Sequence, residues 1–436
     1  MEIGYAKEII TPPFPVYLAG YAGKRLAEEA HDDLYVKVIL IKLRKEVYGI
    51  ISYDLIGIDY LLTGRLEQEL RILGLNPRNF LAAATHTHSG PAGILKTSEG
   101  LLKGTDYIFG TENSELIESI VHRTIQAVKD ALKSCREGRI RIARGSISGV
   151  GKNRNDSSRK GNEDILAAEL QSRDHAPVLL IHYACHPTVL NHENLKLSAD
   201  FPGALDEIMS QKGYAFTLYL NGSCGDISTR FTRQGKGFPE AGRYGCLLAE
   251  KTEQLLKEAR EIQIKKIETG SLTAVLKLKK PEDPQKAAEH LQICRDNLGR
   301  ALEEGIRGAE LRLLKAQLEG AQANLNYAGY GPEQESQPVT VSLWQINQDI
   351  FAGIPGELFS ELSNPLQNGR IHFAGYAGGY LGYFADKAAY DSLNYEALSS
   401  PFERGQAEIL MGEIEKAVKT GISGTGSERC GTDSYI

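Results

Sequence analysis

The pattern of apolar and polar residues predicts strands that alternate with helices. Residues 35–53 (YVKVILIKLRKEVYGIISY) indicate two strands around a short charged turn, ending at Asp54. Residues 58–73 and 114–133 carry apolar side chains with helical spacing, and Asn113 or Ser114 is the expected N-cap of the second helix. Later strands are expected over 176–184, 216–220, 340–346 and 350–354. The alternation predicts an α/β fold.

Residues 281–326 change this pattern to a charged, amphipathic one. Their leucines are spaced by threes, fours and the sums of these: Leu291, Leu298, Leu302, Leu311, Leu314, Leu318 and Leu325. One long helix or a helical hairpin would fit, and the glycines at 299, 305 and 308 favour the hairpin. With no internal repeat and no low-complexity linker, we expect a single domain over 1–436 with this insertion around 281–326. The Gly/Ser-rich residues from about 421 to 436 are expected to form a flexible tail.

Composition and charge exclude several classes of partner. The chain has 436 residues, 42% hydrophobic and 24% charged, with a formal net charge of -6. It has no basic run interleaved with aromatic residues, which argues against nucleic acid as a partner. No window approaches the roughly 18 apolar residues of a membrane span, and the first residues lack a signal-peptide core, so a cytoplasmic location is expected. The six cysteines show no CxxC spacing and are expected to be free thiols.

The most informative short segment is LAAATHTHSGPAG, at residues 81–93. A run of small apolar residues ends at two histidines one residue apart. If the strand continues as an extended chain, His86 and His88 project from the same side before Ser89, Gly90 and Pro91 turn the backbone away. A single histidine in such a place is more often structural, but a pair on one face is a candidate metal site.

Two later segments end in the same way and could complete that site. In VLLIHYACHPTVLN an apolar strand leads to His186 and Pro187, and in FAGIPGELFSEL a strand breaks before Glu357. Glu357 could instead simply favour a helix N-terminus. Zinc accepts imidazole nitrogen and carboxylate oxygen, so the three histidines and Glu357 are candidate ligands of Zn²⁺. Cys185 is a minor alternative, as a metal ligand or a nucleophile.

Other catalytic patterns are absent from the sequence. There is no GxSxG nucleophile elbow, no Walker A sequence and no GxGxxG. Five tyrosines crowd into the glycine-rich residues 375–395, where packing is the ordinary explanation but a few phenols could approach a site: Tyr376, Tyr380, Tyr383, Tyr390 and Tyr395. Two alternatives stay open. One is an amidohydrolase-type barrel, which also uses HxH at a strand end, and the other is a non-catalytic protein with a structural metal.

Taken together, these segments resemble the neutral/alkaline (non-lysosomal) ceramidase family, zinc-dependent amidases that cleave the N-acyl bond of ceramide. The resemblance rests on GYA at 20–22, ATHTHSGP, ACHPT, GDIS, PGE and YLGYFADKAAYDSLNYE, in the family's order along nearly the whole chain. It implies a ceramidase-like catalytic domain alone, with mixed β-sheets layered with helices, and a role in sphingolipid metabolism.

The resemblance also implies roles for individual residues. Zinc would be held by His86, His186, Glu357 and Tyr383. The scissile bond would be surrounded by four further residues, namely His88, Arg154, Ser228 and Tyr395. His88 and Tyr395 would stabilise the oxyanion or protonate the leaving nitrogen, Arg154 would orient the substrate, and Ser228 would hydrogen-bond it.

One departure from the family pattern concerns the substrate. The family's GDVSPN is GDISTR here, so Thr229 and Arg230 follow Ser228. A guanidinium beside the head-group pocket suits an anionic or hydroxylated substrate. The activity expected is metal-dependent hydrolysis of a linear amide, whose substrate is a small molecule or a lipid. The alternative is an esterase or amidohydrolase acting on a small polar substrate.

Overall fold

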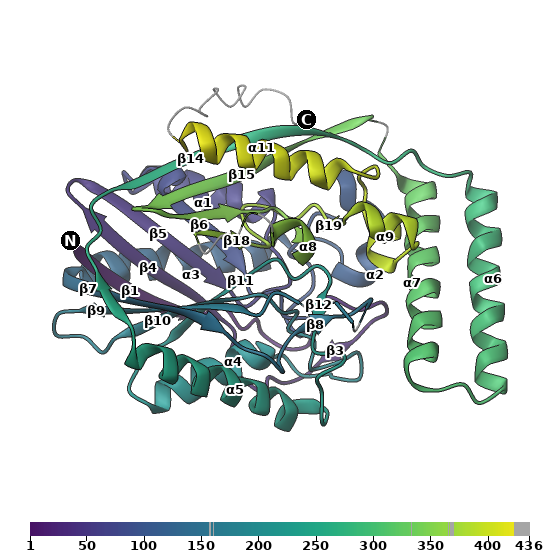
Figure 1. Ribbon diagram of the computed structural model, residues 1–436, viewed down its shortest axis with the longest axis horizontal. Coiled ribbons are helices and arrows are strands. Elements are labelled where there is room, and N and C mark those ends of the chain that lie inside the picture. The colour runs from purple at the N-terminus through teal and green to yellow at the C-terminus, as the bar shows by residue number, and fades with distance from the viewer. Residues whose placement is uncertain (157, 160, 333, 365, 367–369, 423–436) are drawn as a thin grey trace.

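A nine-stranded mixed sheet forms the centre of the molecule in the computed structural model, which describes residues 1–422 except 157, 160, 333, 365 and 367–369 (Figure 1). Its strand order is β11 (Thr217–Asn221), β10 (Val178–Tyr183), β9 (Asp164–Ser172), β7 (Arg136–Ser146), β1 (Glu2–Ile9), β4 (Tyr35–Leu43), β5 (Glu46–Tyr53) and β6 (Phe80–Ala84), with β13 (Arg260–Ile262) paired to β7. The pairs β5–β6 and β10–β11 are parallel. All neighbouring pairs in the series from β10 to β5 are antiparallel.

Helices cover one face of this sheet and a second sheet covers the other. The helices are α1 (Tyr60–Ile72), α3 (Ser114–Ser134), α4 (Asp200–Gln211) and α5 (Gly237–Lys257), and their apolar stripes bury the sheet side chains beneath them. The second sheet has the order β14 (Ile267–Lys277), β15 (Ser336–Ile346), β16 (Asp349–Gly353) and β18 (Ile371–Ala374). Its Trp344 and Phe351 pack against the large sheet, and α11 (Gln406–Thr420) packs on its outer face.

The remaining elements are short and lie mostly where the chain turns between these layers. They are β2 (Val16–Tyr17), β3 (Leu26–Ala27), β8 (Lys152–Asn153), β12 (Ile227–Ser228), β17 (Glu357–Leu358), β19 (Tyr383–Phe384), α2 (Asp106–Phe109), α8 (Ser360–Ser363), α9 (Lys387–Asp391), α10 (Tyr395–Ser399) and the 3-10 turns Pro77–Asn79 and Gly100–Leu102.

The predicted helical hairpin is confirmed. Helices α6 (Pro284–Glu303) and α7 (Gly308–Tyr330) stand side by side at one end of the molecule (Figure 1). Gly305 lies in the connection and Gly308 begins α7, both with positive φ, whereas Gly299 lies inside α6. Leu291, Cys294 and Ala321 form the buried contact between the two helices.

The α/β class and the layering of mixed sheets are confirmed, and each strand and helix listed in the sequence prediction is present within a few residues. The Asn113 carboxamide accepts from Leu116 N and caps α3. The mixed and antiparallel pairing excludes the eight-unit parallel barrel.

Two predictions at the level of the whole chain have a partial outcome. Five of the six cysteines are free thiols, while Cys430 and the expected tail from 423 onward lie outside the described residues. No helix in the described ranges is both long enough and apolar enough to cross a membrane.

Candidate metal centre

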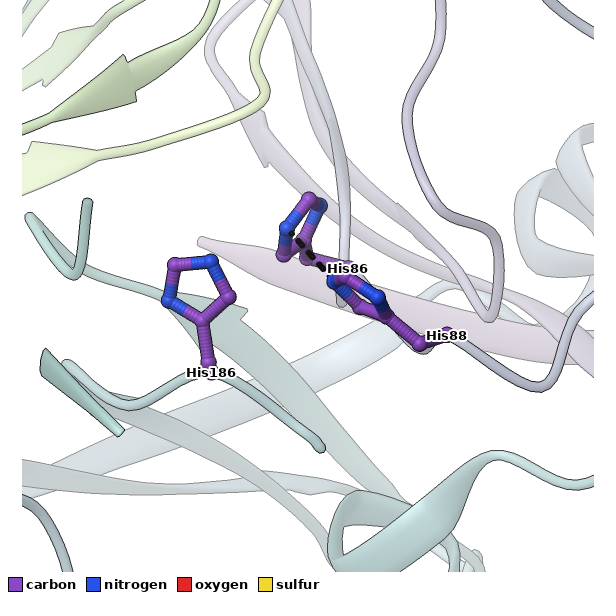
Figure 2. A group of neighbouring side chains, drawn as sticks. All are labelled: His86, His88 and His186. Atoms are coloured by element: carbon purple, nitrogen blue, oxygen red, sulfur yellow. Dashed lines mark hydrogen bonds between the residues drawn. The ribbon is translucent and has the colours of Figure 1, made fainter. Parts of the chain in front are cut away.

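Three histidines from two separate loops meet beside the large sheet (Figure 2). His86 and His88 follow β6, which ends at Ala84, and His186 follows β10, which ends at Tyr183. The two rings lie together as predicted, but the prediction that an extended strand places them on one face is wrong. His86 has a φ of +70°, in the left-handed region, so a tight turn brings the two rings together.

The side-chain nitrogens of the three rings converge. Among the residues that the structure describes, His86, His88 and His186 form a group whose potential ligand atoms all lie within 4.8 Å of one another. The Nε2 atoms of His86 and His88 are 3.2 Å apart. All three residues were candidate ligands from the sequence, so the structure assembles residues that are up to 100 positions apart.

The other nitrogen of each ring is used by the backbone. In all three rings Nδ1 lies within hydrogen-bond distance of a backbone carbonyl oxygen. The distances are 2.6 Å from His86 to Ile56 O, 2.9 Å from His88 to Gly20 O and 2.6 Å from His186 to Cys224 O. A carbonyl oxygen can only accept, so each Nδ1 carries the hydrogen. In a neutral ring Nε2 then carries an unprotonated lone pair. The hydrogen bond from Nδ1 to the backbone fixes the orientation of the ring, as it does for histidines in protein metal sites.

Burial keeps these rings neutral. It lowers the pKa of His86 to about 3, against the opposing effect of Glu357, and lowers the pKa of His186 to about 3, with Arg154 acting in the same direction. Burial and the neighbouring His86 also hold the pKa of His88 well below its usual value. Three lone pairs therefore face one another without a proton between them, which is the donor set that a cation satisfies.

Glu357 adds a carboxylate to the three imidazoles. Its Oε2 lies 3.0 Å from His186 Nε2 and 3.5 Å from His86 Nε2, and the side chain is 2% exposed. The residues present therefore fit a zinc ion chemically, because they offer the nitrogen and oxygen donors that zinc accepts. The sequence prediction placed Glu357 before a helix, and in the structure it starts the two-residue strand β17 ahead of α8.

Tyr383 is held beside Glu357 by a short pair of parallel strands. In the pair β17–β19, Glu357 and Tyr383 are direct register partners. The Tyr383 hydroxyl accepts a hydrogen bond from Arg154 Nη2 at 3.0 Å. Burial, followed by the charge of Glu357, raises the pKa of Tyr383 well above its usual value. The assignment of Tyr383 as a metal ligand stays a prediction.

Arg154 is held by a buried carboxylate that the sequence analysis did not single out. Its Nε donates to Glu396 Oε1 at 2.6 Å, and Asn155 Nδ2 donates to Glu396 Oε2 at 3.0 Å. Burial opposes the guanidinium charge, but Tyr383 and Glu396 raise the pKa of Arg154 well above its usual value. Arg154 therefore stays charged and pointed at the Tyr383 hydroxyl.

The other two predicted site residues lie close to this group. Tyr395 begins α10, and its ring meets that of Tyr383 edge-on at 5.9 Å between centroids. Ser228 forms a backbone bridge with His186, and its Oγ accepts from Arg230 N at 3.3 Å. The structure thus brings all the predicted site residues into one region, while their individual roles stay predictions.

A pocket opens onto the site. Its lining includes His86, His88, Glu357, Tyr383 and Tyr395. Apolar side chains form much of the remaining wall: Ile56, Leu101, Leu102, Ile108, Phe109, Leu381 and Pro401. Helix α7 supplies Ala323, Asn326 and Tyr327, so the hairpin insertion is part of the pocket wall.

Sequence reasoning missed three buried partners of the site. Tyr380 and Tyr376 contact Glu357, and Glu396 pairs with Arg154. The crowding of tyrosines in a glycine-rich segment was the available signal for the first two. The Cys185 alternative is not supported, because this thiol is fully buried and burial raises its pKa well above the usual value.

Comparison with known proteins matches the N-terminal part of the chain to the family that the sequence motifs resemble. Residues 2–215 match the family model for neutral/alkaline non-lysosomal ceramidase, N-terminal. A neutral ceramidase from Pseudomonas aeruginosa superimposes over 99% of this chain and 76% of its own, with a TM-score of 0.73 and 16% identity. A ceramidase complexed with C2 gives 99% and 77%, a TM-score of 0.74 and 15% identity. These likenesses show a shared fold.

Proposed function

Residues 2–215 match the neutral/alkaline non-lysosomal ceramidase family, and from this premise we propose that the chain is a zinc-dependent hydrolase that cleaves an N-acyl amide bond. The observation that supports the proposal most strongly is the convergence of three unprotonated Nε2 atoms and Glu357 Oε2 at a pocket. His86, His186, Glu357 and Tyr383 would hold the ion. When bound, zinc would polarise the carbonyl and lower the pKa of a water to roughly 7.

The chain's own residues would position the substrate and move protons. His88 presents a bare Nε2 to the pocket, and Gly20 O fixes the ring through Nδ1, so His88 can accept a proton and pass it to the leaving nitrogen. Tyr395 lines the same pocket, and burial followed by the charge of Glu319 raises its pKa, so it remains a hydrogen-bond donor at neutral pH. Arg154 would act through the Tyr383 hydroxyl.

The pocket wall bears on the acyl group of the substrate. Leu101, Leu102 and Phe109 form an apolar surface, and Ala323 of α7 lies on the same wall. An acyl chain placed there would be removed from water, at about 25 cal/mol for each Å² buried. The polar residues at the metal end would face the amide.

Metal removal tests the proposal. The purified chain is treated with a chelator, then reloaded with zinc, and hydrolysis of an N-acyl amine is followed by the amine released. We expect turnover to be lost and then restored at about one zinc per chain. Full turnover of the metal-free chain would contradict the proposal. A chain that holds one zinc but hydrolyses no amide or ester in a broad panel would support the alternative of a non-catalytic metal protein.

A further inference from the structure

The two carboxylate oxygens of Glu357 have different partners. Oε2 faces both imidazoles, at 3.0 Å from His186 Nε2 and 3.5 Å from His86 Nε2. Oε1 accepts a hydrogen bond from the Tyr380 hydroxyl at 2.5 Å. A carboxylate can bind a cation through one oxygen or through both. The hydrogen bond from Tyr380 therefore distinguishes the oxygen that faces the histidines from the one that does not.

The Tyr380 ring is fixed on several sides. It is 5% exposed, and the Phe109 ring meets it edge-on at 5.6 Å between centroids. The backbone at Gly57 approaches so closely that a Cβ placed there would lie 2.9 Å from Tyr380 Cδ2. Because the ring has so little freedom, its hydroxyl is held in place for Glu357 Oε1 without further ordering.

Tyr376 lies beside Tyr380 but makes a different contact. Its ring stacks on His86 at 3.9 Å between centroids and 13° between planes. The nearest partner of its hydroxyl is Cys224 Sγ at 3.1 Å, while Glu357 Oε2 lies 3.5 Å away. Both tyrosines are buried, yet only Tyr380 makes a short hydrogen bond to the carboxylate.

We propose that Tyr380 is a positioning residue of the metal centre, which occupies Glu357 Oε1 and so leaves Oε2 as the single carboxylate oxygen offered to the ion. This inference rests on the proposed function, since it takes Glu357 to be a ligand. Partners that orient a ligand in this way change metal affinity or activity by about 10-fold to 100-fold when they are removed. Without the phenol, Oε1 is free to turn toward the ion and compete for the position that a reacting water needs.

The test compares Tyr380→Phe with Tyr5→Phe, the matched control. Tyr5 is also a buried tyrosine with a short hydrogen bond, which its hydroxyl donates to the backbone oxygen of Ala176 at 2.6 Å. Zinc affinity is measured by competition with a chromogenic chelator, and coordination by the visible absorption spectrum of the cobalt-loaded chain. We expect Tyr380→Phe to lower zinc affinity about 10-fold or more, to change the cobalt spectrum and to lower kcat more than it raises KM. Tyr5→Phe is expected to stay within about threefold of wild type, because its hydroxyl bonds to the backbone of Ala176 and Ser172 and not to a residue of the metal centre.

Gly57→Ala supplies a second variant that keeps the phenol and displaces the ring. It is expected to weaken zinc binding in the same direction, and it decides the question if Tyr380→Phe does not fold. A folded Tyr380→Phe chain with wild-type zinc affinity and an unchanged cobalt spectrum would overturn the inference. Equal losses in Tyr380→Phe and Tyr5→Phe would also overturn it. If the wild-type chain binds no zinc, the proposed function fails instead, so the two failures are distinguishable.

Discussion

Glu357 and Tyr383 are register partners in a parallel ladder of only two residues, β17 with β19. This ladder connects the PGE segment to the tyrosine-rich segment, and Arg154 joins it through the Tyr383 hydroxyl. The candidate site is therefore built from loops and very short strands on a rigid double sheet. Such an arrangement leaves ligand geometry to a few backbone contacts, which makes single substitutions informative.

Removing one imidazole ligand should remove the metal. We expect His86→Ala and His186→Ala each to lose bound zinc, because deleting one donor from a small shell sharply weakens binding. Elemental analysis of the purified variants measures this directly. His122→Ala changes an exposed histidine on α3 and is the control, expected to retain about one zinc per chain. Stoichiometric metal in both site variants would rule out the assignment.

His88 distinguishes a ligand from a reaction partner. The family resemblance leaves it off the metal, although its Nε2 lies 3.2 Å from that of His86. His88→Ala should therefore retain zinc and lose turnover by about 100-fold or more, as expected for a missing general acid or base. Zinc content and kcat are measured on the same preparation. A metal-free His88→Ala chain would make His88 a third imidazole ligand.

The sequence could predict the elements of the fold and the segments that carry the site, because both depend on local patterns. Apolar periodicity gave the strands around 35–53 and the hairpin around 281–326. The geometry of the site depends on contacts that no local pattern encodes. The left-handed turn at His86 and the pairing of Glu396 with Arg154 are examples, since each requires a distant neighbour. For the same reason Tyr380 could not be separated from the other tyrosines.

The ion pair between Glu396 and Arg154 should matter for turnover without holding the metal. Glu396→Gln keeps the shape but removes the charge from a pair whose side chains are 2% and 11% exposed. We expect turnover to fall about 10-fold, zinc content to stay unchanged, and the free energy of unfolding to fall by about 2 kcal/mol. Chemical denaturation and metal analysis check the two parts.

The matched control for that prediction is Glu413→Gln, in an exposed pair with Lys416 on α11. It should leave turnover unchanged and should change the free energy of unfolding by no more than about 0.5 kcal/mol. Loss of zinc in Glu396→Gln would show instead that the pair supports the metal shell.

The raised pKa of Asp200 leads us to expect that the stability of the folded chain depends on pH. Asp200 is 3% exposed, and burial raises its pKa to about 7, although Leu190 N and Phe201 N donate to the carboxylate. The folded chain therefore keeps the proton after the unfolded chain has lost it near pH 3.8. Stability from this group is fully present below pH 3.8 and is lost as the pH rises toward 7, by at most about 4 kcal/mol.

The comparison is with Asp200→Asn, which cannot ionise and tolerates the positive φ of +59° at this position. Urea unfolding at pH 5 and pH 8 should show that wild type loses stability relative to Asp200→Asn as the pH rises. A difference between the two chains that does not vary with pH would contradict the prediction.

The last prediction concerns the substrate, for which Arg230 gives the strongest indication. It follows Ser228 and Thr229, and its Nη1 donates to the backbone oxygen of Arg154 at 3.4 Å. Burial and then the positive charge of Arg154 lower the pKa of Arg230. The charges of Arg230 and Arg154 are near enough to influence each other, and such a pair of cations favours an anionic or hydroxylated group in the substrate.

We therefore expect a short-chain N-acyl amine or polar ester to be cleaved faster than long-chain ceramide. The apolar wall at Leu101, Leu102 and Phe109 would receive one acyl chain, whereas ceramide carries two long chains that both need apolar surface. The measurement is kcat/KM for both substrate types with the zinc-loaded chain, ceramide being presented in detergent. Arg230→Gln is the variant to compare, because it removes the charge and keeps a polar side chain. It should lower kcat/KM for the polar substrate and leave that for ceramide nearly unchanged, because only the polar substrate uses the charge. A tenfold advantage for ceramide in the wild-type chain would instead make the lipid amide the preferred substrate.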